Sequence, residues 1–166
     1  MAEKTLHDLF HDTLKDVYYA EKKILSTLPK MAKAAQAPEL KAAFEKHRDQ
    51  TEGQVERLIS VFGIIDEKPV GKKCPAIEGI LEEGSEIMGE YKGTAALDAG
   101  LIAAAQAVEH YEMTRYGTLK RWAQNLGLSD AVQLLDATLR EESQTDTDLS
   151  GLADQIANPK AQMAAE

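Results

Sequence analysis

The stretch "QAVEHYEMTRYGTL", residues 106–119, places two acids and a histidine in the middle of a segment with the composition of a helix. At about 100° per residue, Glu112 falls at the centre of the apolar stripe of this helix and Glu109 near its edge, whereas His110 points away from the stripe. An ionised carboxylate in an apolar core is destabilising unless it is paired. The segment is therefore either a solvated helix face or part of a bundle whose inward carboxylates meet a cation.

The whole chain has the composition of a helical domain. Its 166 residues suit one domain, and abundant Ala, Leu, Glu, Lys and Gln with only 5% aromatic residues favour helices over strands. The net charge of −9 argues against a nucleic-acid partner, which needs a basic face. A single cysteine, Cys74, excludes a disulfide framework and a cysteine-based zinc site. Because the sequence shows no signal-peptide core and no apolar run of membrane-spanning length, we expect a cytoplasmic protein without membrane contact.

Helix start and stop signals divide the chain into four long helices and one short one. Thr5 with Asp8 three residues on predicts a capping box at the start of the first helix, and Pro38 suits the first turn of the second. Thr94 and Ser129 are expected to cap the last two long helices. The expected helices span about residues 5–35, 38–63, 76–90, 94–125 and 130–156, followed by a flexible C-terminal tail over residues 158–166.

The lengths of the connections predict the topology. Short turns join the first two long helices and the last two, so each pair is antiparallel, whereas the connection between the pairs is long and carries the short helix. A four-helix bundle with a single long crossover is the ferritin-like arrangement. We therefore predict an all-α, ferritin-like four-helix bundle with a small fifth helix, forming a single domain over residues 1–157.

Acids lie on the apolar stripes of three of the four long helices. Glu21 is central on the first stripe and Glu142 on the last, with Asp146 one turn later, whereas the second helix offers His47 and Gln54 instead of an acid. Lys and Arg are nearly absent from the stripes, so a pair of cations explains the clustered acids better than protonation does. Hard oxygen ligands suit iron or manganese, with histidine as a borderline ligand. The candidate metal ligands are Glu21, Glu109, Glu112, Glu142, Asp146 and His47.

Structural roles are the alternative for each candidate. A single inward acid could accept a hydrogen bond from Tyr18, Tyr116 or a buried water, although three converging acids favour a metal site. The choice between a structural role and a metal ligand stays open for two residues. Glu109 lies near the edge of its stripe, and Asp146 could contact a partner helix. A histidine on an apolar stripe, such as His47, is more often packed and hydrogen-bonded than bound to metal.

Three other features have simpler explanations. His110 is expected to bond a neighbouring element or to line a dimer face. Cys74 is expected to be a half-buried packing residue, although its place at a helix start could lower its thiol pKa. The acidic run "EEGSE", residues 82–86, is expected to be a solvated helix face.

Four stretches of the chain together resemble the YciE/YciF family of ferritin-like bacterial proteins. They are "DVYYAEKKIL" (16–25), "KCPAIEGILEEGSEI" (73–87), "GLIAAAQAVEHYEMTRYGTL" (100–119) and "LREESQTDTDL" (139–149). The third stretch is the most specific, and the resemblance extends from about residue 4 to 155. It implies a ferritin-like bundle that forms a homodimer and takes part in stress responses.

Similarity to rubrerythrin-type sites implies roles for individual acids. Glu21 would be the ligand of the first helix, Glu109 and Glu112 a Glu-x-x-Glu pair, and Glu142 the acid of the last helix. Two expected histidines are not matched. The second long helix has Gln50, Thr51 and Gln54 where an acid and a histidine are expected, and in the last helix Asp146 is the nearest substitute.

These features predict a stress-response protein with a carboxylate-bridged di-metal site. Two iron or manganese ions per chain would support an oxidase or peroxidase reaction, with peroxide or oxygen as the small oxidant, or the oxidation of ferrous ion. The first alternative is a non-catalytic bundle with a degenerate site that acts through dimerisation or partner binding. The second alternative is a site for a single metal that uses only the strongest acids.

Overall fold

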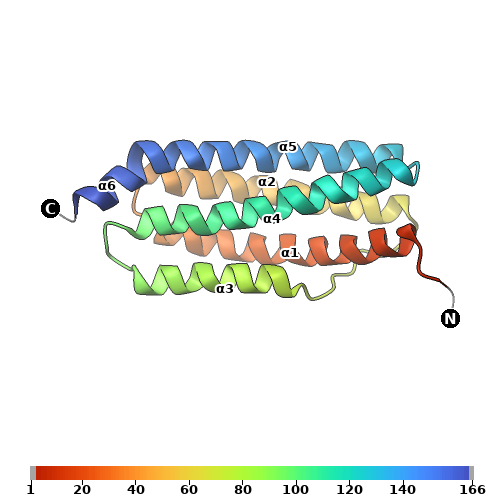
Figure 1. The fold of residues 1–166 in the computed structure, drawn as a ribbon, viewed down its shortest axis with the longest axis horizontal. Coiled ribbons are helices and arrows are strands. Elements are labelled where there is room, and N and C mark those ends of the chain that lie inside the picture. Colours follow the sequence, from red (N-terminus) through yellow and green to blue (C-terminus); the bar gives the residue numbers. More distant parts are fainter. Residues whose placement is uncertain (1–2, 165–166) are drawn as a thin grey trace.

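The computed structural model describes residues 3–164, and its four long helices form an elongated bundle (Figure 1). The long helices are α1 (Leu6–Ala34), α2 (Pro38–Ile64), α4 (Leu97–Asn125) and α5 (Ser129–Leu152). The short helix α3 (Pro75–Glu90) lies on the connection between α2 and α4, outside the bundle, where it packs against α4 and α1. The predicted all-α bundle with a long crossover and a small fifth helix is confirmed.

The helix ends show which capping signals act. The predicted capping box at α1 is present, with Thr5 N donating to Asp8 Oδ2 over 2.8 Å. The prediction that Thr94 caps α4 is wrong, because its hydroxyl donates to the Tyr91 carbonyl of the preceding turn and α4 begins only at Leu97. Asp98, buried on α4, instead caps the α1–α2 turn: its carboxylate accepts the N–H groups of residues 36 and 37, each over 2.8 Å.

The C-terminal segment differs from its prediction. A π-helical segment (Ala153–Ala157) continues α5 into a further helix, α6 (Asn158–Met163), so residues predicted as a flexible tail are helical. Two contacts hold this segment against the bundle. Ala157 is buried in the core, and Lys160 Nζ donates to Gln36 Oε1 over 2.8 Å. Residues 165 and 166 lie outside the described part of the chain.

The apolar core is divided into two clusters by a polar layer. On α1, Val17 belongs to one cluster and Ile24 to the other, and Glu21 lies between them. On α2, Phe44 and Leu58 belong to different clusters in the same way. The polar layer consists of the buried side chains Glu21, His47, Thr51, Gln54, Glu109, Glu112, Thr138 and Glu142. The two apolar clusters therefore keep water away from these polar groups on both sides.

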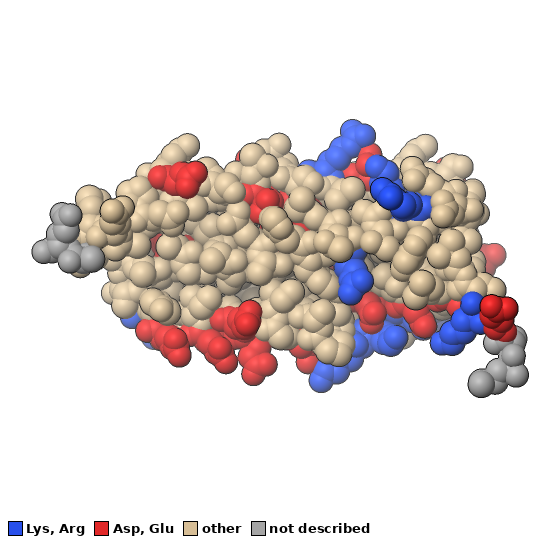
Figure 2. Space-filling model, viewed as in Figure 1, with Lys and Arg blue, Asp and Glu red and all other residues tan. Residues whose placement is uncertain are grey.

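The crossover helix presents several acids to solvent. Glu82, Glu83 and Glu86 are exposed on α3, and Figure 2 shows red side chains along the lower edge, where Figure 1 places this helix. The run predicted to be a solvated helix face is thus confirmed as one. Among the described residues, no helix is both long and apolar enough to span a membrane.

Close packing of α3 on α4 depends on a glycine. A Cβ added to Gly100 would lie 2.6 Å from Ile87 Cγ2, whereas one added to Gly117 on the same helix would meet nothing within 4 Å. We expect Gly117→Ala to stabilise the protein by about 1 kcal/mol through helix propensity. Gly100→Ala should be less stable than Gly117→Ala by about 1–3 kcal/mol, because the stiff Ile87 side chain must move. Urea unfolding of both variants measures this, and equal stability would contradict the tight contact.

Candidate metal centre

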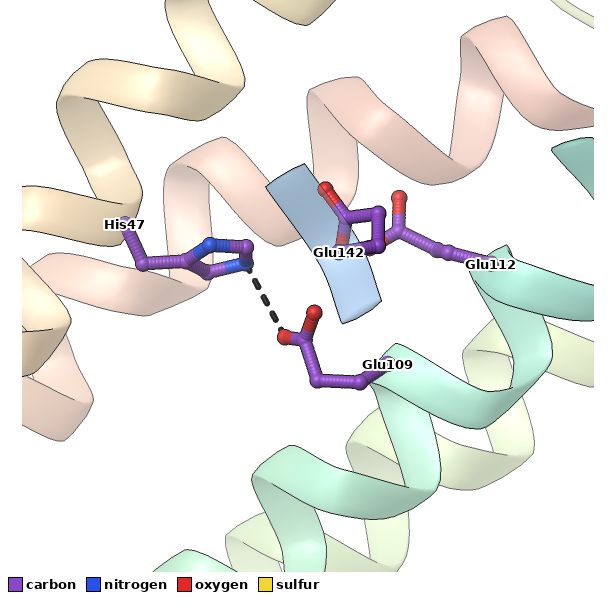
Figure 3. Close-up of side chains that lie close together, drawn as sticks. All are labelled: His47, Glu109, Glu112 and Glu142. Atoms are coloured by element: carbon purple, nitrogen blue, oxygen red, sulfur yellow. Dashed lines mark ion pairs between the residues drawn. The ribbon is translucent and has the colours of Figure 1, made fainter. Parts of the chain in front are cut away.

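Four potential metal ligands converge in the middle of the bundle (Figure 3). They are His47 on α2, Glu109 and Glu112 on α4, and Glu142 on α5, and one ligand atom from each lies within 4.8 Å of the others. All four are buried, with His47 the most exposed at 4%. The four residues lie at the same level along the bundle, in the polar layer between the two apolar clusters.

The acids form a row with chemically different ends. His47 Nε2 lies 3.1 Å from Glu109 Oε1 at one end, without the alignment of a hydrogen bond (Figure 3). Glu142 is close enough to share a proton with both Glu109 and Glu112. Glu112 in turn lies beside Glu21, whose Oε1 accepts a hydrogen bond from the buried Tyr116 hydroxyl. The order along this row, which we call the carboxylate row, is His47, Glu109, Glu142, Glu112, Glu21 and Tyr116.

Many polar atoms of the carboxylate row have no donor or acceptor partner among the described residues. Neither oxygen of Glu112 accepts a hydrogen bond from an N–H or hydroxyl group, and neither nitrogen of His47 forms a hydrogen bond, although Nε2 lies beside Glu109. The acids Glu21, Glu109 and Glu142 each keep one free oxygen, Oε2. Buried polar atoms without partners are rare in folded proteins and costly, so a cluster of them requires an explanation.

Burial raises the pKa of every acid in the carboxylate row. For Glu21 the pKa rises to about 8, through burial and then the nearby Glu142 carboxylate, against the lowering effect of the Tyr116 hydrogen bond. Burial raises the pKa of Glu109 to about 7, although its hydrogen bond with Glu142 lowers it. Glu112 has a pKa well above the usual value, through burial and then the charge of Glu142. Without a cation, the folded protein thus keeps protons on these acids that free carboxyl groups would lose.

A side branch links the carboxylate row to the surface. Gln54 Nε2 donates to Glu142 Oε1 and to Glu141 Oε2, the latter over 3.1 Å. Glu141 also forms a two-pronged ion pair with Arg57, over 2.6 and 2.8 Å. Arg57 is therefore neutralised by Glu141 rather than by the buried acids. The sequence placed Gln54 on an inward stripe, but did not indicate the Arg57–Glu141 pair, which depends on how α2 and α5 align along their lengths.

Two sequence candidates lie apart from the row. Asp146, predicted as a ligand, is not among the four converging residues, and its carboxylate lies 3.1 Å from His110 Nε2 and 3.1 Å from Gln106 Nε2. His110 is exposed, as predicted, and bonds the neighbouring helix α5 through this contact. Cys74, expected to be half-buried, is fully buried, with its Sγ 3.0 Å from the Tyr111 hydroxyl. The structure thus brings four of the six predicted ligands within 4.8 Å of one another, with Glu21 beside them and Asp146 apart.

The residues of the row fit a pair of hard cations. Three properties support this fit: free carboxylate oxygens, an imidazole without a hydrogen bond, and the lack of any buried Lys or Arg in the described residues. Carboxylates and imidazole are the ligands that iron and manganese take in proteins. A protein amine or guanidinium that could neutralise the acids is absent from the polar layer of residues 3–164.

Comparisons with known proteins agree with the fold. A family model described as a domain of unknown function, DUF892, matches residues 5–162. Protein YciF of Escherichia coli (strain K12) is 42% identical over 163 residues, which is 98% of each chain. The crystal structure of that stress protein has a TM-score of 0.89 and covers 94% of this chain and 99% of its own. YcfI of Rhodopseudomonas palustris, provisionally described as a structural protein, has 44% identity and a TM-score of 0.86, covering 89% and 94%.

Proposed function

Since the chain belongs to the DUF892 family and is similar to YciF in sequence and fold, we propose that it is a stress-response protein with two iron or manganese ions in its core. The proposed reaction is the consumption of peroxide or the oxidation of ferrous ion. The observation that carries this proposal is the buried row of four acids and one imidazole that lacks a protein cation.

Charge balance supports two divalent ions rather than one. Glu21, Glu109, Glu112 and Glu142 carry four negative charges when ionised, and Arg57 is already neutralised by Glu141. One divalent ion would leave two uncompensated buried charges, which would cost several kcal/mol. Two divalent ions compensate all four, so the row has the charge that a di-metal site requires.

The side chains of the row would hold the ions in different ways. Glu112, with both oxygens free, is placed to bridge two ions. Glu21 and Glu142 each have one oxygen fixed by a hydrogen bond, from Tyr116 and Gln54 respectively, and the other free. Hydrogen bonds of this kind orient metal ligands and hold them ready. The apolar clusters on both sides exclude bulk water from the reaction.

A bound pair of divalent ions would supply the two electrons that, with two protons, reduce one peroxide to two waters, and each further reduction would need an electron donor from solution. The protein must then admit a small oxidant and keep larger molecules out of direct contact with the ions. The buried position of the row meets the second requirement, since the exposed fraction of its acids is at most 1%.

Elemental analysis of protein purified without chelator tests the proposal, with peroxide consumption measured on the same sample. We expect about two iron or manganese ions per chain, and consumption of peroxide that continues with an added electron donor and is lost in Glu112→Ala, because two ligand oxygens are gone. Glu83→Ala, which removes an exposed acid of α3, is the matched control and should keep both. A metal content near zero, unchanged after loading with ferrous or manganous ion, would refute the proposal.

A non-catalytic bundle is the second candidate. It is favoured by the second long helix, where Thr51 and Gln54 occupy buried positions that an acid and a histidine would fill in a complete site. The description of the Rhodopseudomonas palustris relative as a structural protein points the same way. This candidate predicts a melting temperature that does not change with iron or manganese, because only a ligand of the native state stabilises it.

The proposal includes a homodimer in the cytoplasm. The family resemblance supports the dimer, and sedimentation of the purified protein measures its mass directly. A sedimenting species with the mass of one chain, at concentrations well above micromolar, would contradict the dimer without affecting the proposed metal site.

A further inference from the structure

We infer that the carboxylate row holds two chemically unlike cation positions, and that the carbonyl oxygen of Gln54 is a ligand of the weaker one. This inference rests on the proposed metal-binding function. The stronger position lies at the His47 end and contains a nitrogen ligand. The weaker position lies at the Tyr116 end and is built from oxygens alone.

The stronger position has the larger set of converging donors. His47 Nε2 and one oxygen each from Glu109, Glu112 and Glu142 lie within 4.8 Å of one another. The imidazole forms no hydrogen bond although only 4% of the residue is exposed. Four donors that include a nitrogen suit the later first-row divalent ions, whose affinity for nitrogen exceeds that of manganese.

The weaker position has fewer donors, and none is nitrogen. Glu21 contributes only Oε2, because Tyr116 donates its hydroxyl hydrogen to Oε1. Glu112 contributes its second oxygen, which the first position leaves free. A third donor comes from α2, where Gln54 is fully buried and its amide nitrogen donates to Glu141 and Glu142. Gln54 lies toward the Glu21 end of the row, because Arg57, one turn further along α2, is near enough to Tyr116 and Glu21 for their charges to add to the effect of Glu141 in raising its pKa.

The amide oxygen of Gln54 is the observation that identifies the third donor. Because the nitrogen is fixed by two carboxylates, the oxygen cannot exchange places with it without losing both hydrogen bonds. This oxygen has no partner among the described residues. A buried amide oxygen without a hydrogen bond is costly, and a hard cation is a ligand that satisfies it.

The chemistry of the donors sets the difference between the positions. An amide oxygen is neutral and a weaker donor than an imidazole nitrogen toward cobalt, iron or zinc, whereas manganese discriminates less between the two. The first ion also takes part of the charge of Glu112, which both positions share. Binding of Co²⁺ should therefore occur in two phases whose affinities differ by about tenfold or more, and Mn²⁺ should separate the phases less.

Calorimetric titration of the full chain with Co²⁺ and with Mn²⁺ tests the inference. His47→Gln should abolish the tight phase and weaken Co²⁺ more than Mn²⁺. Glu21→Gln should abolish only the weak phase and change the tight dissociation constant by less than about threefold. Gln54→Leu should abolish the weak phase and also weaken the tight phase, because it removes the hydrogen bond that orients Glu142. His110→Ala removes an exposed histidine on the turn next to Glu109 and is the control that should change neither phase. Circular dichroism checks that each variant is folded, and Gln54→Glu, which restores an oxygen donor, should restore the weak phase.

The outcomes separate this inference from the proposed function. Two ions that bind in a single phase, or a weak phase that survives in both Gln54→Leu and Glu21→Gln, would overturn the unequal positions while leaving a di-metal site. One ion per chain that survives both substitutions would overturn the second position. Absence of any binding would overturn the proposed function and the inference together.

Discussion

Glu112→Gln should raise the stability of the metal-free protein at about pH 8 and at the same time abolish its stabilisation by Mn²⁺. Glu112 is fully buried beside two other carboxylates, Glu142 and Glu21, and none of its oxygens accepts a hydrogen bond from a donor group of the described residues. The metal-free folded state must therefore either protonate this acid or hold its charge in an apolar surrounding. An uncharged amide of nearly the same shape removes that cost.

The gain in metal-free stability and the loss of stabilisation by Mn²⁺ differ in size and appear under different conditions. Replacement of a buried ionisable group by a neutral one of similar volume stabilises proteins by about 1–4 kcal/mol, or several degrees in melting temperature for a chain of this length. Saturation of the wild type with Mn²⁺ at about a hundred times the dissociation constant should add about 2.7 kcal/mol, and the variant should gain nothing. Thermal unfolding with EDTA and with Mn²⁺ measures both.

Glu83→Gln on α3 is the matched control, because it makes the same chemical change at an exposed position. Its stability should stay within about 0.5 kcal/mol of the wild type under both conditions. If Glu112→Gln were less stable than the wild type in EDTA, the Glu112 carboxyl group would stabilise the metal-free protein, contrary to the expected cost of its burial. If the variant kept the full stabilisation by Mn²⁺, Glu112 would not be a ligand.

Helical phase predicted most of the candidate site because each helix has only one buried face. Glu21, Glu112 and Glu142 sit at the centre of their stripes, and all three are fully buried. Helical phase does not determine whether residues of two neighbouring helices lie at the same level along the bundle. Asp146 follows Glu142 by one turn on the same stripe, yet it bonds His110 and Gln106 outside the row. That difference depends on how α4 and α5 pack, which the periodicity of one helix does not contain.

Contacts between distant segments account for the other differences. The Asp98 carboxylate caps the α1–α2 turn from 61 and 62 residues away in the sequence, so no local capping signal indicates it. The helix α6 lies against the bundle through Lys160, which bonds Gln36 at the opposite end of the sequence. The sequence predicted a cap correctly where the two bonded residues are three positions apart, as in the Thr5–Asp8 capping box.

The metal-free protein should become less stable as the pH rises from about 5 to about 8. The pKa of Glu21 is raised to about 8 and that of Glu109 to about 7, from the value of 4.5 for a free carboxyl group. Between these values the folded state keeps protons that the unfolded chain has released, so each rise in pH favours unfolding. Each extra proton held by the folded state lowers the free energy of unfolding by about 1.4 kcal/mol per pH unit.

Surface acids act in the opposite direction at lower pH. The hydrogen bond from Lys120 lowers the pKa of Asp136, and the bonds from Tyr19 and then Lys73 lower that of Glu78. Such groups stabilise the fold above their unfolded pKa and lose this contribution as the pH falls below it. The stability of the metal-free protein should therefore be greatest at about pH 5, between the two effects.

Saturating Mn²⁺ should reverse the slope above this maximum, because ions displace protons from their ligands and bind more tightly as the pH rises. Urea unfolding at a series of pH values from about 4 to about 8, with EDTA and with Mn²⁺, measures both slopes. Glu112→Gln should flatten the slope in EDTA, since one acid of the coupled row is gone. A stability in EDTA that increases up to about pH 8 would show that the buried acids are ionised and compensated without metal, which would remove the physical basis for placing cations in the row.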